Sequence, residues 1–112
     1  HSYSSAASDV YKRQIEDYSK LSKQKKDEFE YHFMLLRIWY QSVNRLKNNL
    51  NDPLHDTSLL HGMKRFLNSY PFADLLSIVS DLEDVVRAIS MNLYMPLVLT
   101  NLLLETQKNL KQ

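Results

Sequence analysis

The chain has 112 residues, with 14 lysines and arginines against 13 aspartates and glutamates, one glycine, three prolines and no cysteine. A chain of this length forms one domain at most and buries only about two thirds of its unfolded surface, which disfavours an enzyme with a deep substrate cavity. The lack of cysteine excludes disulfides, zinc fingers and thiol nucleophiles. Tight hairpins and phosphate-binding loops need glycine, so its scarcity predicts an all-α protein without a nucleotide-binding loop.

Residues 1–14 show no apolar periodicity, and we expect them to be a disordered or non-native leader. Within this stretch, SSAASDVYKRQ resembles the in-frame translation of a transposase-type sequencing adapter. We therefore expect the native domain to occupy residues 15–112 and to be truncated at its N-terminus. The leader holds one more basic than acidic residue, so the remaining chain is balanced in charge. Such a domain has no overall field to attract nucleic acid or an anionic membrane.

Apolar residues at three- and four-residue spacing predict the longest helix from Lys25 to about Asn49. A second flank of this helix is apolar as well, and so wide an apolar arc indicates that the helix is central in the fold or that it has a second partner. The candidate interface residues on that flank are Tyr31, Leu35, Ile38 and Trp39. Before this helix, Ile15–Ser22 is expected to be the remnant of another helix, followed by an exposed turn.

The segment Asn48–Asp56 is rich in turn-forming residues and is the predicted main loop. A residue within Asp56–Ser58 is expected to cap the next helix, which would end near Asn68. Gly62 within this helix indicates a close helix approach or a local weakness. Proline fits the first turn of a helix, so Pro71 and Pro96 are expected to open the third and last helices. The result is a small bundle of four to five helices. Its expected core residues are Phe33, Leu36, Val79, Leu82, Leu99 and Leu103.

No catalytic, cofactor-binding or metal-binding residue can be identified from the pattern. The three histidines after the leader lack the i, i+4 spacing of a helical metal site, and no serine lies in a nucleophile motif. The acidic group of Asp81, Glu83 and Asp84 is expected to form the solvated face of a helix. The basic cluster of Lys20, Lys23, Lys25 and Lys26 is followed at once by acidic residues, which oppose nucleic-acid binding.

The order of helices, from about Phe33 to Leu110, resembles the C-terminal collar domain of the bacterial DNA polymerase III delta-prime subunit, a clamp-loader protein. The most specific part is DLEDVVRAISMNLYMPLVLTNLLLE, which is similar to the family's charged helix, short Asn-containing break and leucine-rich last helix. The leucines of that pattern are Leu97, Leu99, Leu102, Leu103 and Leu104. The turn LNSYPFADLL resembles the family's Leu-Ser-Pro helix entry with extra residues, and Tyr94 stands where the family favours a second Asn.

This resemblance implies an oligomerisation domain that joins clamp-loader subunits for loading the sliding clamp in DNA replication. The fragment itself would not be an enzyme, although the subunit it resembles belongs to the DNA polymerase III holoenzyme. The implied partners are other clamp-loader subunits, with DNA reached only through the complex. No cofactor, small-molecule substrate or membrane is implied, and the expected location is the cytoplasm. The alternatives are an unrelated helical interaction domain and a small nucleic-acid-binding bundle that uses the lysine cluster.

Overall fold

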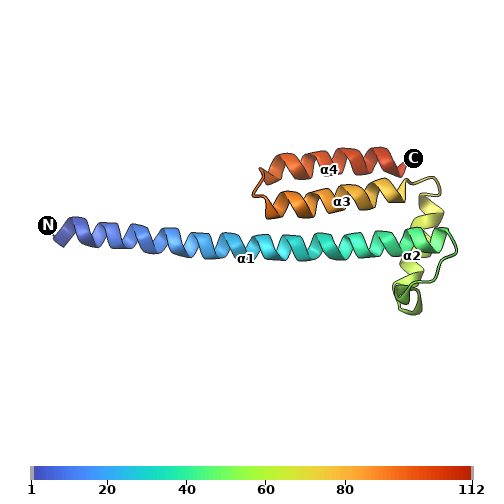
Figure 1. The fold of residues 1–112 in the computed structure, drawn as a ribbon, viewed down its shortest axis with the longest axis horizontal. Coiled ribbons are helices and arrows are strands. Elements are labelled where there is room, and N and C mark those ends of the chain that lie inside the picture. Colours follow the sequence, from blue (N-terminus) through green and yellow to red (C-terminus); the bar gives the residue numbers. More distant parts are fainter. Residues whose placement is uncertain (1, 112) are drawn as a thin grey trace.

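The computed structural model describes residues 2–111, and that range contains helices and no strand (Figure 1). The elements are α1 (Ser2–Lys47), a short 3₁₀ helix, η1 (Pro53–Asp56), α2 (Leu60–Ser69), α3 (Leu75–Ser90) and α4 (Met95–Leu110). The predicted all-α class, a small helical bundle, is confirmed.

Helix α3 is the centre of the fold, since it packs against α1 on one side and against α4 on the other. Figure 1 shows these three helices side by side, with α3 antiparallel to both neighbours. Helix α2 packs on the C-terminal end of α1. The molecule measures 72 × 29 × 19 Å, because the N-terminal half of α1 extends beyond the ends of α3 and α4. The fold is therefore a flat layer of three helices with one long projecting arm.

The core lies where α1, α2 and α3 meet. Its buried residues come from all three helices and from the turn before α3; they are Val43, Met63, Ala73, Leu75, Ile78 and Leu82. Four aromatic side chains close one end of this core through edge-on and tilted ring contacts. They are Trp39, Tyr40, Phe66 and Tyr70. Burial of these groups holds α1, α2 and α3 together.

Four of the six expected core residues are buried or half-buried. Val79 and Leu82 lie in the core, while Phe33 and Leu99 are half-buried. The expectation is wrong for Leu36 and Leu103, whose exposed fractions are 45% and 70%. The reason is the flat arrangement: α1 and α4 each meet α3 along one line, so the rest of each apolar arc stays uncovered in this chain.

Helix α1 is continuous, and the predicted break between Ile15–Ser22 and the longest helix does not occur. The segment contains neither proline nor glycine, so nothing in it interrupts helical hydrogen bonding. Residues 2–14 are helical as well, which differs from the expected disorder. Their non-native origin stays a prediction, since helicity does not bear on it.

The starts of α2 and α3 differ from the predicted positions, whereas the start of α4 agrees with its prediction. Helix α3 begins at Leu75 instead of Pro71, because the Asp74 carboxylate accepts a hydrogen bond from the Ser77 backbone N–H and caps the helix there. No residue of Asp56–Ser58 caps α2, which begins at Leu60 without a side-chain cap. A Cβ added at Gly62 would meet no atom within 4 Å, so of the two expectations for this glycine the close helix approach is wrong. Pro96 does lie in the first turn of α4.

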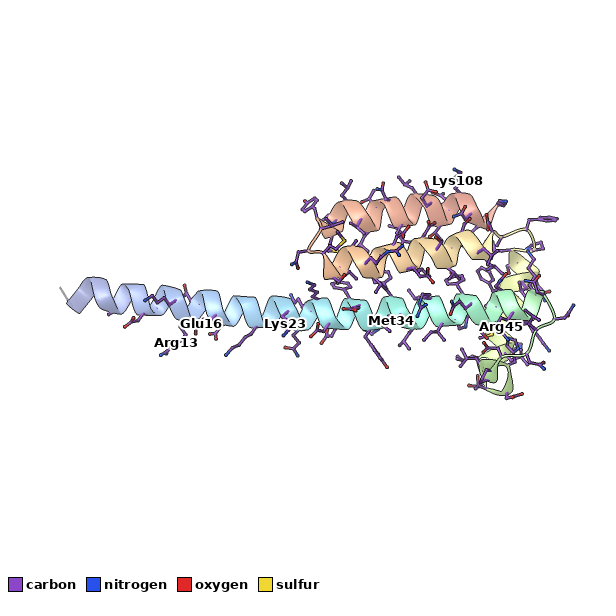
Figure 2. All side chains as sticks on the ribbon, in the orientation of Figure 1. Arg13, Glu16, Lys23, Met34, Arg45 and Lys108 are labelled. Atoms are coloured by element: carbon purple, nitrogen blue, oxygen red, sulfur yellow. The ribbon has the colours of Figure 1, made fainter. Side chains whose placement is uncertain are left out.

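Deletion of residues 1–14 should leave the free energy of unfolding unchanged to within about 0.5 kcal/mol. Figure 2 shows Arg13 on the part of α1 that extends past the other helices, whereas the core residues of α1 lie near its C-terminal end. Urea unfolding followed by circular dichroism measures the difference. A loss above about 1 kcal/mol would show that the leader packs on the bundle.

Candidate interaction surface

The outer side of α1 carries an apolar stripe made of Tyr31, Leu35 and Ile38. These residues are spaced i, i+4 and i+7, and their exposed fractions are 60, 45 and 41%. Phe33 marks the opposite side, because it packs toward the core. At 3.6 residues per turn, the stripe lies roughly 140° to 200° around the helix axis from Phe33. We call these three residues the α1 stripe.

The side of α1 that faces α3 is identified by polar contacts as well as by packing. Arg37 Nη1 lies 3.5 Å from Glu83 Oε1 on α3, and Lys26 Nζ donates a hydrogen bond of 2.6 Å to Asn92 Oδ1. Both residues fall on the same side of α1 as Phe33. Tyr31 and Leu35 therefore point away from α3, whereas Ile38 borders a groove that Leu76 and Val79 of α3 also line. Three of the four predicted interface residues are exposed.

Trp39, the fourth predicted interface residue, lies elsewhere. Its ring makes edge-on contacts with Tyr40 and Phe66, with centroids 5.0 and 5.5 Å apart, and it packs against the core. Helix α2 covers this part of α1, which sequence spacing alone did not reveal. Trp39 is half-buried within the chain and is not a free anchor on the surface.

A second apolar stripe runs along the outer side of α4. Leu97 and Leu104 are each 60% exposed, and they lie roughly 140° and 160° around the helix from Leu102, which packs against the core. These leucines belong to the leucine pattern of the predicted last helix, and their spacing alone does not identify them as a surface. The flat layer therefore has apolar residues on both outer sides, at α1 and at α4.

Ser42, Asp52 and His55 come together, but their geometry is structural. The Ser42 hydroxyl is fully buried and donates to Asp52 Oδ1 at 3.0 Å, while His55 Nε2 lies 2.9 Å from the backbone oxygen of Ser42. A catalytic triad needs an exposed hydroxyl beside the imidazole and the carboxylate behind it. Here the histidine contacts the serine carbonyl oxygen instead, so the cluster fastens the loop to α1.

The remaining residues considered in the sequence lie in separate places. Within residues 2–111, no group of three or more histidine or acidic side chains is close enough to hold a metal ion. The acidic set of α3 divides among different contacts: Glu83 faces Arg37, Asp84 pairs with Arg87 on the same helix, and Asp81 lies between α3 and α4. The expected solvated face fits Asp84, which is exposed, and in part Glu83, whose side chain is 43% exposed, but not Asp81, which is half-buried between the two helices.

The four lysines of the basic cluster lie on continuous helix instead of in the expected turn. Lys20, Lys23 and Lys25 are exposed, whereas Lys26 contacts Asn92. Acidic residues follow on the same helix, so the local charge is mixed. Among the helices of residues 2–111, none combines the length and the hydropathy that a bilayer crossing requires.

The comparisons with known proteins give no match to any protein family, curated protein or solved structure.

Proposed function

We propose that this chain is a helical protein–protein interaction domain and that it serves as the collar-like oligomerisation domain of a bacterial clamp-loader subunit. The single observation that carries the interaction role is the α1 stripe. Its three residues are apolar, large and exposed at helical spacing along α1, and Tyr31 and Leu35 lie on the side of the helix opposite Phe33. Exposed apolar patches of this kind mark contact surfaces on folded proteins.

The outer stripe of α4 supports the same role. A subunit in a ring needs two different contact surfaces, because each neighbour is met through a different side. The flat layer offers apolar residues at both outer sides, α1 and α4, which lie on either side of α3. This arrangement suits a subunit placed between two others.

The proposal that the assembly is a clamp loader rests on the sequence resemblance of the segment from about Phe33 to Leu110. The leucine pattern of α4 and the short Asn-containing break before it are the parts that carry it. In that role the domain would hold subunits together while the sliding clamp is loaded, would hydrolyse nothing, and would reach DNA only through the complex. The cytoplasmic location belongs to the same proposal.

Replacement of both Leu35 and Ile38 by Glu should abolish association with sister clamp-loader subunits and leave the helical fold intact. The two side chains are exposed, so the charges are tolerated in the free chain but would be desolvated in an interface. Co-elution on size-exclusion chromatography measures the association, and circular dichroism measures the fold. Gln24→Glu adds one charge at an exposed position of the same helix and serves as the matched control.

The other outcomes separate the parts of the proposal. If the wild-type chain binds a different partner but no clamp-loader subunit, the interaction role holds and the clamp-loader role is wrong. If the Leu35 and Ile38 variant binds clamp-loader subunits as tightly as the wild type, the α1 stripe is not the interface. Unfolding of the variant would show that this side of α1 is needed within the chain.

A further inference from the structure

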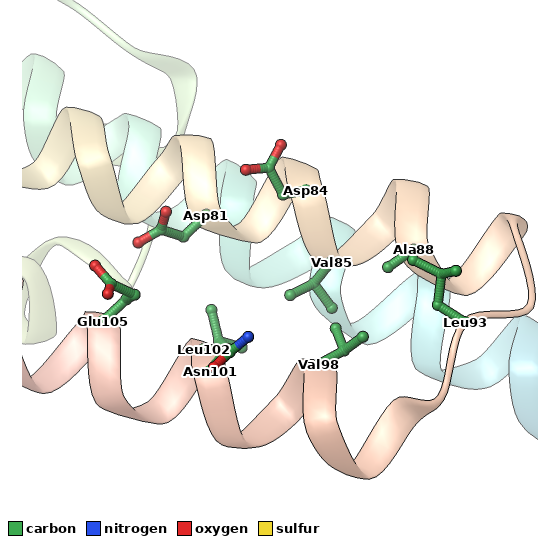
Figure 3. Close-up of a pocket in the computed structure, with 9 residues that line it drawn as sticks. All are labelled: Asp81, Asp84, Val85, Ala88, Leu93, Val98, Asn101, Leu102 and Glu105. Carbon is green, nitrogen blue, oxygen red and sulfur yellow. The ribbon is translucent and has the colours of Figure 1, made fainter.

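A groove of about 350 Å³ lies between α3 and α4, on residues that neither outer stripe includes (Figure 3). Val85 and Ala88 of α3 are buried at its base, and Val98 and Leu102 of α4 face them across the groove. The base of the groove is therefore apolar along about one helical turn of each helix.

One end of this groove is acidic. Figure 3 shows Asp81 of α3 and Glu105 of α4 at the same end, with Asp84 farther along α3. Asp84 pairs with Arg87, so one of these carboxylates has a cation partner. Among the described residues, Asp81 accepts a hydrogen bond of 3.1 Å from Asn109 Nδ2, which is a neutral donor. Asp81 and Glu105 thus place negative charge beside an apolar surface.

The electrostatics of this end favour a bound cation. Burial raises the pKa of Asp81, and the negative charges of Glu105 and Asp84 raise it further, while the Asn109 hydrogen bond lowers it. The ionised form of Asp81 is therefore held in an unfavourable environment in the free chain. A positive group between Asp81 and Glu105 would relieve the like-charge repulsion.

The cation that fits is an organic one. Within residues 2–111, no three histidine or acidic side chains, including those around the groove, lie close enough together to hold a metal ion. Lysine and arginine side chains combine an apolar stem with a charged head, which matches an apolar base that ends at two carboxylates. Phosphate-bearing ligands are disfavoured by the same carboxylates. The complementary ligand is thus a basic side chain supplied by a protein.

We propose that the groove between α3 and α4 binds a lysine or arginine side chain presented, next to an apolar residue, by a helix of a partner protein. The stem would lie on Val85 and Leu102, and the charged head would reach Asp81 and Glu105. This inference rests on the proposed role as an interaction domain, and it names the chemistry of one partner at a surface separate from the α1 stripe.

The test uses the full chain and a synthetic helical peptide of about 15 residues whose one face carries leucine and lysine. In NMR titrations we expect the shifts to concentrate at Val85, Ala88, Val98 and Leu102. A matched peptide with glutamate in place of lysine should bind at least about tenfold more weakly, because its charges repel the groove. Raising the ionic strength should weaken binding of the lysine peptide.

A double variant and its matched control test whether binding of the lysine peptide needs the two carboxylates at the acidic end of the groove. Asp81→Asn combined with Glu105→Gln should weaken binding of the lysine peptide at least about tenfold. Folding is retained, because the amide oxygen introduced at position 81 still accepts the hydrogen bond from Asn109, and Glu105 is exposed. The matched control, Asp27→Asn with Glu28→Gln, removes two exposed acidic charges from α1 and should leave the affinity unchanged.

Several outcomes would overturn the inference. These are no binding at about 1 mM lysine peptide, equal binding of the glutamate peptide, shifts centred on the α1 stripe, or equal losses in both double variants. Each leaves the proposed function standing, since the Leu35 and Ile38 variant tests that function on another surface. Conversely, loss of clamp-loader association in that variant says nothing about the groove.

Discussion

Replacement of Ile78 by Ala should lower the free energy of unfolding by about 2 to 5 kcal/mol. Ile78 is 1% exposed and lies on α3, the helix that contacts both α1 and α4. Truncation removes buried apolar surface and leaves a cavity beside Val43 and Leu82, members of the same core. Chemical unfolding monitored by circular dichroism gives the change directly.

Leu76 provides the matched control for this substitution, because it lies on the same helix and is 70% exposed. Leu76→Ala should change the free energy of unfolding by no more than about 0.5 kcal/mol. The pair therefore tests the rotation of α3 about its axis as well as its burial. Similar losses at both positions would mean that α3 presents a different side to α1 than the structure shows.

The sequence was sufficient to predict the features that local chemistry decides. The apolar stripe of α3, with Leu75, Val79 and Leu82 at helical spacing, lies on its buried side. Pro96 lies in the first turn of α4, because a proline there loses no helical hydrogen bond. The loop before α2 contains Pro53 and the Asx cap of Asp52, both common in turns. These signals act within a few residues and need no knowledge of packing.

Other features depend on which helices meet, and periodicity does not contain that information. Leu36 and Leu103 lie on apolar arcs, yet the flat layer leaves them exposed because no described helix packs on that side. Trp39 is half-buried for the converse reason, since Phe66 of α2 packs against it. The width of an apolar arc therefore does not show which of its residues another helix covers.

Of the two candidate surfaces, one could be predicted from the sequence and the other could not. The α1 stripe was predicted because its residues repeat at i, i+4 and i+7 along one helix. The groove between α3 and α4 was not, because Asp81 and Glu105 are far apart in the sequence and meet only through helix packing. The 3.1 Å contact between Asp81 and Asn109 likewise joins the two helices. A site assembled from two helices becomes visible only in the tertiary structure.

Replacement of Asp52 by Ala should lower the free energy of unfolding by about 2 to 3 kcal/mol at neutral pH. Asp52 Oδ1 accepts hydrogen bonds from the Leu54 backbone N–H at 2.9 Å and from the Ser42 hydroxyl at 3.0 Å. Its loss uncaps η1 and leaves the fully buried Ser42 hydroxyl with Met63 Sδ, 3.6 Å away, as a weak acceptor. The half-exposed Arg45, 3.5 Å from Asp52 Oδ2, adds little.

Asp56→Ala is the matched control, because Asp56 lies in the same loop and is exposed. We expect a change within about 0.5 kcal/mol for it. Thermal or urea unfolding of both variants measures the contrast. Equal effects would show that the loop is fastened to α1 by something other than the Asp52 carboxylate.

The same carboxylate predicts how stability depends on pH. The Leu54 hydrogen bond is the main cause that lowers the pKa of Asp52, with burial opposing it and the Ser42 hydrogen bond adding to it. A carboxyl whose pKa is lower in the folded state than its unfolded value of about 3.9 stabilises the fold above that value. This contribution is lost as the pH falls through the folded-state pKa. The Asp74 carboxyl, with its pKa lowered by the Ser77 side chain and backbone, acts in the same direction.

Asp81 acts in the opposite direction, because its pKa is raised by burial and by Glu105 and Asp84. Its contribution to stability is complete below the unfolded pKa and is lost as the pH rises through the folded one. Asp52→Asn should therefore flatten the loss of stability on the acid side, whereas Asp81→Asn should raise stability at neutral pH. Urea unfolding of the wild type and both variants from about pH 3 to pH 7 separates these opposite signs. Parallel curves for all three proteins would contradict both assignments.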